Sequence, residues 1–260
     1  HPNNGEKILR NFGIWPEEFV EEGFNTFVDE NKDESKVTNG IFAPWMVYKK
    51  EFLEMGGHDP VLKSCREDSD VFNRMMLEGF SFIQPWNSLV YHLTGRGAGS
   101  FSGDEARHEE WQKEMENSTK EFIRKWGTGV QHDALMKPIV TPFYDKGLVI
   151  KNATLDRISL LEPYVSSLYV DKFKDKFIEI ESQNTAYNLE DKVNDITIEP
   201  TNDIVLFIDG DKFTQSDFNF YAQLSRVFEE QKPPIGAFKL GNINIKVSKY
   251  EEKVYNRVHT

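Results

Sequence analysis

Residues 148–170 read LVIKNATLDRISLLEPYVSSLYV, and this stretch decides the fold class. Its two ends, Leu148–Ile150 and Leu168–Val170, are short apolar runs typical of buried strands, whereas Leu155–Leu161 has the apolar spacing of a helix. A strand, a helix and a second strand in this order predict an α/β unit.

The same alternation continues toward the end of the chain, after a boundary marked by Pro138 and Pro142. We expect two further strands, one helix and a closing hairpin, at 177–180, 204–208, 216–229 and 237–247. The sequence therefore predicts a second, smaller α/β domain at residues 146–260, an accessory domain whose role the sequence does not indicate.

Residues 1–140 are predicted to form a separate domain in which helical spacing is frequent. Helices are expected at 6–12, from Pro16 onward, at 49–55 and 70–79, and around Trp111 to Trp126. Gly56, Gly79 and Gly127 follow these patterns, and glycine readily adopts the left-handed conformation that ends a helix. Strands are expected at 37–48, 81–85 and 89–93.

Composition restricts the classes of partner and compartment. The 260 residues contain no apolar run of the roughly 18 residues that suggest a spanning helix. The net charge of -12 disfavours nonspecific nucleic-acid binding, which needs a basic surface. A single cysteine, Cys65, suits a reducing compartment, so a cytoplasmic location is expected. The start at His1, in loop-like sequence, favours a fragment of a longer chain.

An acidic segment at 66–70, REDSD, directly precedes the helix pattern at 70–79. Carboxylates at a helix start are stabilised by unpaired backbone N–H groups and the helix dipole. One interpretation is therefore structural, with Asp68 or Ser69 capping the helix. The surrounding order favours another, because Gly56-Gly57 precedes the segment and a strand ending in Tyr91-His92 follows it.

This series resembles the second half of the metal-dependent GT-A-type glycosyltransferases, in particular the family two enzymes and the β-1,4-galactosyltransferases. The resemblance covers roughly residues 37–100 and is carried by GGHD at 56–59, EDSDVFNR at 67–74, Gly79-Phe80 and VYH at 90–92. It implies a partial GT-A domain at residues 1–140 that forms the acceptor-side part of the catalytic domain.

The resemblance also implies residue roles. Asp68 would be the catalytic base of an inverting transfer, because a sugar hydroxyl needs a carboxylate to take its proton. Glu67 and Asp70 would hold acceptor hydroxyls and so position the nucleophile. His92 would join an Asp-x-Asp motif around manganese, a metal that suits imidazole and carboxylate ligands. A lone histidine at a strand end is otherwise usually structural.

Two further groups fit substrate binding. Arg96 lies in a glycine-rich stretch, 94–104, that would fold as a lid over the nucleotide diphosphate, unless the stretch is an ordinary flexible loop. Trp86, together with Trp45, would offer a platform on which a sugar ring stacks, although such tryptophans are more often part of a core.

The sequence departs from the family in two places. The upstream Asp-x-Asp motif is absent, so either the nucleotide-binding half lies outside this sequence or Asp209-Gly210-Asp211 supplies the motif. That segment follows the apolar run Ile204–Ile208, but Asp-Gly is also ordinary turn chemistry. The tryptophan usual just before the acidic segment is replaced by Lys63-Ser64-Cys65, which leaves the acceptor sugar open.

The leading hypothesis is an inverting glycosyltransferase that uses Mn2+ and moves a sugar from a nucleotide-sugar donor to a hydroxyl of a carbohydrate acceptor. The chain would then be an incomplete catalytic domain, inactive by itself if the nucleotide-binding half is missing. One alternative is a carbohydrate-binding or assembly module without turnover. Another is a metal-dependent hydrolase built from the acidic segment and His92, although a hydrolytic site normally needs three protein ligands.

Overall fold

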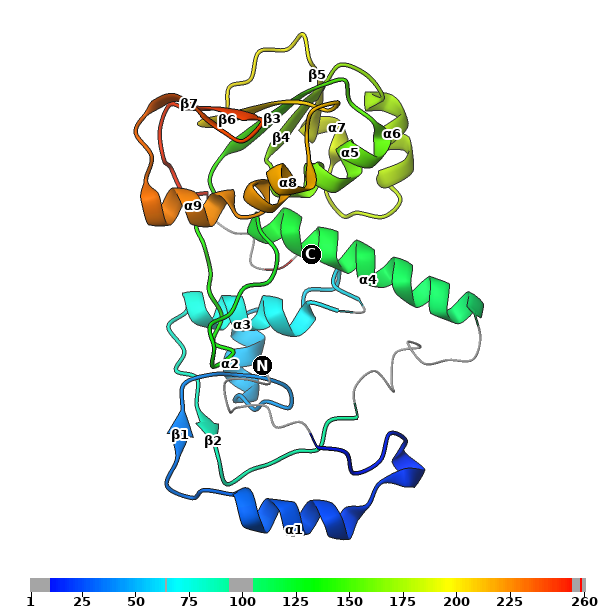
Figure 1. Cartoon of the computed structure of the whole chain (residues 1–260), viewed down its shortest axis with the longest axis vertical. Helices are drawn as coiled ribbons and strands as arrows, with labels where there is room; N and C mark the ends of the chain where they lie inside the picture. The colour runs from blue at the N-terminus through cyan, green and yellow to red at the C-terminus, as the bar shows by residue number, and fades with distance from the viewer. Residues whose placement is uncertain (1–9, 64, 94–104, 254–257, 259–260) are drawn as a thin grey trace. The chain divides into compact units, whose positions relative to one another are not determined.

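The computed structural model describes residues 10–63, 65–93, 105–253 and 258, which form two compact units (Figure 1). The first unit comprises residues 1–58, 63–116 and 131–140, and the second comprises 59–62, 117–130 and 141–260. The second unit has more residues than the first, so the expectation of a smaller second domain is wrong. The chain passes from one unit to the other within helix α4 (Glu105–Trp126), again at residue 130, and finally at residue 140, close to the expected boundary.

The second unit is built on a six-stranded, mostly parallel sheet flanked by helices, which confirms the α/β prediction at this level. The strand order is β5-β4-β3-β6-β8-β7; β5, β4, β3 and β6 run parallel, and β8 pairs antiparallel with both β6 and β7. The strands are β3 (Lys146–Lys151), β4 (Ser167–Val170), β5 (Val193–Asp195), β6 (Ile204–Asp209), β7 (Gly236–Leu240) and β8 (Ile243–Val247).

The helices of this unit differ from the expectation at two places, because the run at 177–180 is helical and the helix expected at 216–229 is divided into two. They are α5 (Leu155–Leu161), the 3-10 turn η2 (Glu162–Tyr164), α6 (Lys174–Glu181), α7 (Leu189–Lys192), α8 (Gln215–Tyr221) and α9 (Leu224–Gln231). The strand expected at 177–180 is wrong, because only Phe177 and Ile178 are buried and they lie on one face of α6. Such a short apolar run does not distinguish a strand from a buried helix segment.

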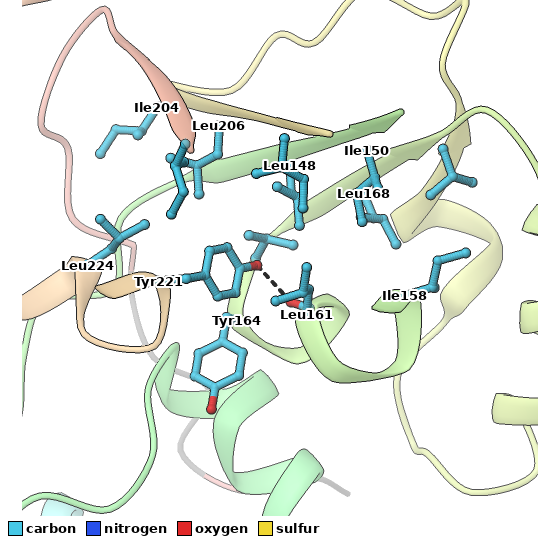
Figure 2. Close-up of a cluster of buried hydrophobic side chains, with 14 of the residues drawn as sticks. Leu148, Ile150, Ile158, Leu161, Tyr164, Leu168, Ile204, Leu206, Tyr221 and Leu224 are labelled. Atoms are coloured by element: carbon cyan, nitrogen blue, oxygen red, sulfur yellow. Dashed lines mark hydrogen bonds between the residues drawn. The ribbon is translucent and has the colours of Figure 1, made fainter. Parts of the chain in front are cut away.

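The main core of the second unit lies between the sheet and its helices. Figure 2 shows Leu148, Ile150 and Leu206 of the strands facing Leu161 of α5 and Tyr221 of α8. The Tyr221 hydroxyl donates to the Leu161 carbonyl oxygen at 2.8 Å, so the buried phenol keeps a hydrogen bond. β-branched and leucine side chains on one face of the parallel strands thus fix which side of the sheet the helices cover.

The last turns of α4 add a buried ionic cluster to this unit. The Arg124 guanidinium donates to carboxylate oxygens of Glu121, Glu162 and Glu181, each at 2.6 Å for the shortest contact. Lys192 forms a further ion pair with Glu162 at 2.6 Å. These charges are almost completely buried, so each would be costly without its partners, and Phe122, Ile123 and Trp126 bury apolar surface from the same turns of α4.

The first unit has little regular sheet. Its described elements are η1 (Pro16–Glu18), α1 (Glu21–Asn31), β1 (Val37–Thr38), α2 (Lys49–Glu54), α3 (Glu67–Leu77), β2 (Gln84–Pro85) and the start of α4. A short antiparallel ladder joins β1 to β2, and a single bridge joins His132 to Pro138. The strands expected over 37–48, 81–85 and 89–93 are therefore wrong except at those two-residue pieces. The helices expected over 49–55 and 70–79 are confirmed, and the glycines after them, Gly56, Gly57 and Gly79, have positive φ.

A small core supports α3. Val71, Phe72 and Met75 project from α3 onto Met55 and Phe82, and all five side chains are buried. This burial fixes the orientation of the helix, so the acidic first turn of α3 projects in a defined direction. Among the helices of the described chain, none combines the length and apolar composition that a membrane span requires.

Candidate functional site

Helix α3 begins without a side-chain cap. Arg66 is the N-cap residue, in the left-handed conformation with φ 71°, and no side chain accepts a capping hydrogen bond. The interpretation that Asp68 or Ser69 caps the helix is therefore wrong. Glu67 and Asp68 instead lie in the first turn, where the helix dipole favours a negative charge.

Asp68 is held by Trp45. The Trp45 indole Nε1–H donates to Asp68 Oδ1 at 3.1 Å, in a partly buried contact between residues 23 positions apart. The Trp45 ring packs edge-on against Phe72 at 5.6 Å between ring centroids and also contacts Phe52 and His58. Trp45 is therefore held within the small core rather than free as a sugar-stacking platform, and it aims its polar edge at Asp68.

Glu67 carries a buried oxygen without a partner. Its Oε2 is buried and accepts no hydrogen bond from any residue that the structure describes. A buried acceptor without a donor is energetically unfavourable unless a ligand or solvent supplies one. The described residues open no path to this oxygen, so the contact between Glu67 and an acceptor hydroxyl stays a prediction.

Asp70 has a structural environment instead. Its side chain is fully buried and forms an ion pair with Arg74 at 2.9 Å. Arg74 also donates to the backbone oxygens of Met55 at 2.8 Å and Gly57 at 2.5 Å. Asp70 thus holds the guanidinium that ties α3 to the turn after α2, and this geometry does not support the predicted contact between Asp70 and a substrate hydroxyl.

The hydrogen bond between Arg74 and the Gly57 carbonyl oxygen gives a physical link between the glycine pair and the acidic segment that follows it in the sequence. The Gly57 carbonyl can meet Arg74 because Gly57 adopts a positive φ of 69° at the end of α2. The pair Asp70 and Arg74 is spaced i, i+4, so both side chains lie on one face of α3. This spacing was the signal that would have identified Asp70 as a partner of Arg74.

Trp86 has one face covered. The Lys36 ammonium lies 3.1 Å from the centre of the Trp86 ring, and the indole Nε1–H donates to Thr38 Oγ1 at 3.1 Å. A sugar ring could stack only on the opposite face, so the predicted platform is reduced to one side.

The predicted manganese site is not complete in the described chain. His92 is exposed, and its ring lies edge-on to Phe42 at 6.2 Å. Across residues 10–63, 65–93 and 105–253, no three His, Cys, Asp or Glu side chains gather closely enough to hold a metal ion. These residues do not fit a metal centre by themselves, and Arg96 of the predicted lid lies outside the described residues.

The second unit places Asp209-Gly210-Asp211 at the carboxyl end of β6. Asp209 Oδ1 accepts hydrogen bonds from Asn152 Nδ2 at 2.9 Å and from the backbone N–H of Asp211 at 3.1 Å. The Asn152 hydrogen bond, followed by that of Asp211, lowers the pKa of Asp209. A side chain at Gly210 would collide with the Asn152 carbonyl oxygen, so glycine is required where the two strand ends approach.

These residues lie where the strand order reverses. From β3 the chain continues to β4 and β5 on one side, whereas β6 pairs with the other side of β3. In open α/β sheets, such a reversal leaves a crevice outside the carboxyl ends of the strands where ligands bind. Asp171 after β4 accepts the backbone N–H groups of Asn152 and Ala153, which shapes the same edge.

No protein-family model, no curated protein sequence and no solved structure matches this chain. The candidate site is therefore described from the geometry of its own residues, and the resemblance of residues 37–100 to GT-A-type enzymes stays a prediction.

Proposed function

We propose that the chain carries the acceptor-side carboxylate site of an inverting, GT-A-type glycosyltransferase, with Asp68 as the catalytic base. The observation that carries this proposal is the set of groups that contact the Asp68 carboxylate. It is held by an uncharged N–H donor, and no cation pairs with it among the described residues. Asp68 Oδ2 is thus not engaged by a cation in the described chain, whereas Asp70 Oδ2 receives both Nε and Nη2 of Arg74.

The proposed reaction needs few groups. An acceptor hydroxyl gives its proton to Asp68 as its oxygen bonds to the anomeric carbon, and the bond from that carbon to the nucleoside diphosphate breaks on the opposite face. The configuration at the anomeric carbon is thereby inverted. In this scheme Glu67 would orient the acceptor through a second hydroxyl, which requires its buried Oε2 to become accessible when the acceptor binds.

Manganese enters the proposal only through the resemblance. His92 would be one ligand, but the described residues supply no complete ligand set, and no step of the reaction is assigned to a metal here. The metal-dependent hydrolase therefore gains no support. The alternative of a carbohydrate-binding module without turnover is separated from the transferase by the assay below.

The test is release of nucleoside diphosphate by the purified chain from a panel of UDP- and GDP-sugars, with an oligosaccharide mixture as acceptor and with or without manganese. Asp68→Asn is expected to lower turnover about 100-fold or more, as for loss of a general base. Glu54→Gln, which removes an exposed carboxylate of the same unit, is the matched control and should retain turnover. His92→Ala should lower turnover only in the presence of manganese.

Two outcomes would contradict the proposal. Parental turnover in Asp68→Asn would remove Asp68 from the base role. Absence of turnover with every donor, together with oligosaccharide binding that Asp68→Asn leaves unchanged, would favour the carbohydrate-binding module over the transferase.

A second function, binding of the nucleotide diphosphate, is favoured for the sheet unit by the strand-order reversal beside Asp209. In this case Asp209-Gly210-Asp211 would serve as the acidic motif that faces a cation and the diphosphate. Isothermal titration of the chain with UDP-sugar and manganese tests it. Asp209→Asn should weaken binding at least about tenfold, as loss of a charged contact does, whereas binding unchanged by Asp209→Asn and Asp211→Asn would exclude the site.

A further inference from the structure

The side chain that fixes Asp68 comes from a distant segment. Trp45 lies in an extended stretch before α2, and its indole N–H meets Asp68 Oδ1 at 3.1 Å. We infer that Trp45 is a positioning residue for the base of the proposed transferase, acting through Asp68 rather than stacking on a sugar. This inference rests on the proposed function, because it assigns a role within the same site.

The geometry gives Trp45 the rigidity that such a role needs. The terminal torsion of an aspartate is broad and roughly two-fold, so an unassisted carboxylate samples many orientations. The Trp45 indole cannot rotate with the carboxylate, because its ring is packed against Phe52, His58 and Phe72. A donor fixed by three rings therefore holds Oδ1, and Oδ2 is left as the oxygen that accepts the proton.

The burial of α3 also restrains Asp68, which lies in the first turn of this helix. Val71 and Phe72, close after Asp68, are buried in the small core, and Phe72 also contacts the Trp45 ring. Trp45 and the first turn of α3 are thus held by one cluster of side chains. A displacement of about 1 Å in a reacting group can lower a rate about 100-fold, so restraint of this kind affects turnover directly.

The competing explanation is structural. A partly buried indole N–H favours an acceptor, and Asp68 would serve as one without any catalytic consequence. The two explanations differ in what they predict for kinetics. Removing the donor from a positioning residue lowers kcat and leaves the KM for donor and acceptor unchanged, whereas a structural loss lowers the amount of folded protein and leaves the kcat of the folded fraction intact.

Trp45→Phe is the decisive variant, because it keeps an aromatic ring in the cluster and removes only the N–H and part of the ring. We expect kcat to fall on the order of tenfold with both KM values unchanged, as for loss of one hydrogen bond to a charged group. Trp111→Phe is the matched control. Trp111 belongs to the same unit, and its Nε1–H has no acceptor among the described residues, so this variant should keep the parental kcat.

A second measurement does not depend on turnover. Hydrogen exchange of the Trp45 indole N–H, followed by NMR, should accelerate in Asp68→Ala, which removes the acceptor, while the exchange of the Trp111 indole stays unchanged. Exchange of Trp45 that Asp68→Ala does not alter would show that the contact is absent and would overturn the inference.

The kinetic outcomes separate the two proposals. Parental kcat in Trp45→Phe, with Asp68→Asn inactive, would overturn the role of Trp45 and leave the base assignment standing. Parental activity in Asp68→Asn would overturn the proposed function and the role of Trp45 with it. A rise in KM with constant kcat in Trp45→Phe would mean that the indole contacts substrate, which also contradicts positioning through Asp68.

Discussion

Replacing Lys146 with methionine should remove a strong pH dependence of stability from the sheet unit. Lys146 is the first residue of β3, and its ammonium position is completely buried. Nζ donates to Ser225 Oγ at 2.8 Å and to the Gly127 carbonyl oxygen at 3.3 Å. Both partners are uncharged. Burial, and then the nearby Lys192 cation, lower the pKa of Lys146 from 10.5 to about 7.

The sign of the effect follows from proton binding. Between about pH 7 and pH 10.5 the unfolded chain carries a proton on Lys146 that the folded chain lacks, so the free energy of unfolding rises with pH over this range. Below this range both states are protonated, and the contribution of Lys146 is at its least favourable. From about pH 7 to about pH 9.5 the linkage adds about 3 kcal/mol to the free energy of unfolding.

The assay is urea unfolding of the parent chain and of Lys146→Met at about pH 7 and about pH 9.5, with the difference between the two pH values compared between proteins. Methionine keeps most of the buried volume and cannot titrate. Loss of the hydrogen bonds to Ser225 and Gly127 is the same at both pH values and cancels. Between about pH 7 and about pH 9.5, the free energy of unfolding should increase by about 3 kcal/mol more in the parent than in Lys146→Met. An equal pH response in both proteins would refute a neutral, buried amine at this position.

Three further predictions concern the same unit. Arg124→Met leaves buried carboxylates without their guanidinium and should lower the free energy of unfolding by about 3–5 kcal/mol. The control Arg226→Met removes an exposed i, i+4 ion pair and should change this free energy by less than about 1 kcal/mol. Urea unfolding of both variants measures the two changes. Although burial alone would raise the pKa of Glu162, the Lys192 and Arg124 cations lower it from 4.5 to about 2. This contribution to the free energy of unfolding is complete above pH 4.5 and is lost as pH falls toward 2. Between these pH values the parent should therefore lose about 3 kcal/mol more of its free energy of unfolding than Glu162→Gln does. Gly127→Ala places Cβ 2.6 Å from Phe143 at a φ of 70° and should destabilise the chain by about 1–3 kcal/mol in the same unfolding assay.

Helix ends were predictable because their cause is local. Gly56, Gly57, Gly79 and Gly127 all adopt positive φ directly after helices, and that conformational freedom can be read from the residue type alone. The hairpin β7–β8 was predictable for a similar reason, since two short apolar runs are joined by Gly241 with φ 59°.

Strands in the first unit were not predictable, because a strand exists only where another strand pairs with it. Residues 39–48 contain no helix and, among the described residues, pair with no other strand. The alternation of apolar residues there has a different cause: Ile41, Trp45 and Val47 pack on the small core. Alternation records burial on one side and does not by itself indicate pairing.

The candidate site was predictable only in part. The acidic segment was located by its order relative to the two glycines, but the roles of its members depend on contacts that periodicity does not encode. Asp70 could have been assigned to Arg74 from the i, i+4 spacing on one helix. The contact between Trp45 and Asp68 joins residues 23 positions apart in different elements, and nothing in local sequence indicates it.

The two acidic candidates differ in the chemistry that their hydrogen bonds allow, and this difference assigns them separate roles. Asp209 accepts an amide N–H and a backbone N–H, which lower its pKa and keep it anionic, so it is poorly suited to take a proton and well suited to face a cation. Asp68 receives a single uncharged donor and keeps one carboxylate oxygen for a substrate proton. As two separate proposals, Asp209→Asn should weaken nucleotide binding by the sheet unit, whereas Asp68→Asn should lower turnover about 100-fold or more and leave that binding unchanged. Titration calorimetry and steady-state kinetics of the two variants distinguish these effects, and the reverse pattern would exchange the two roles.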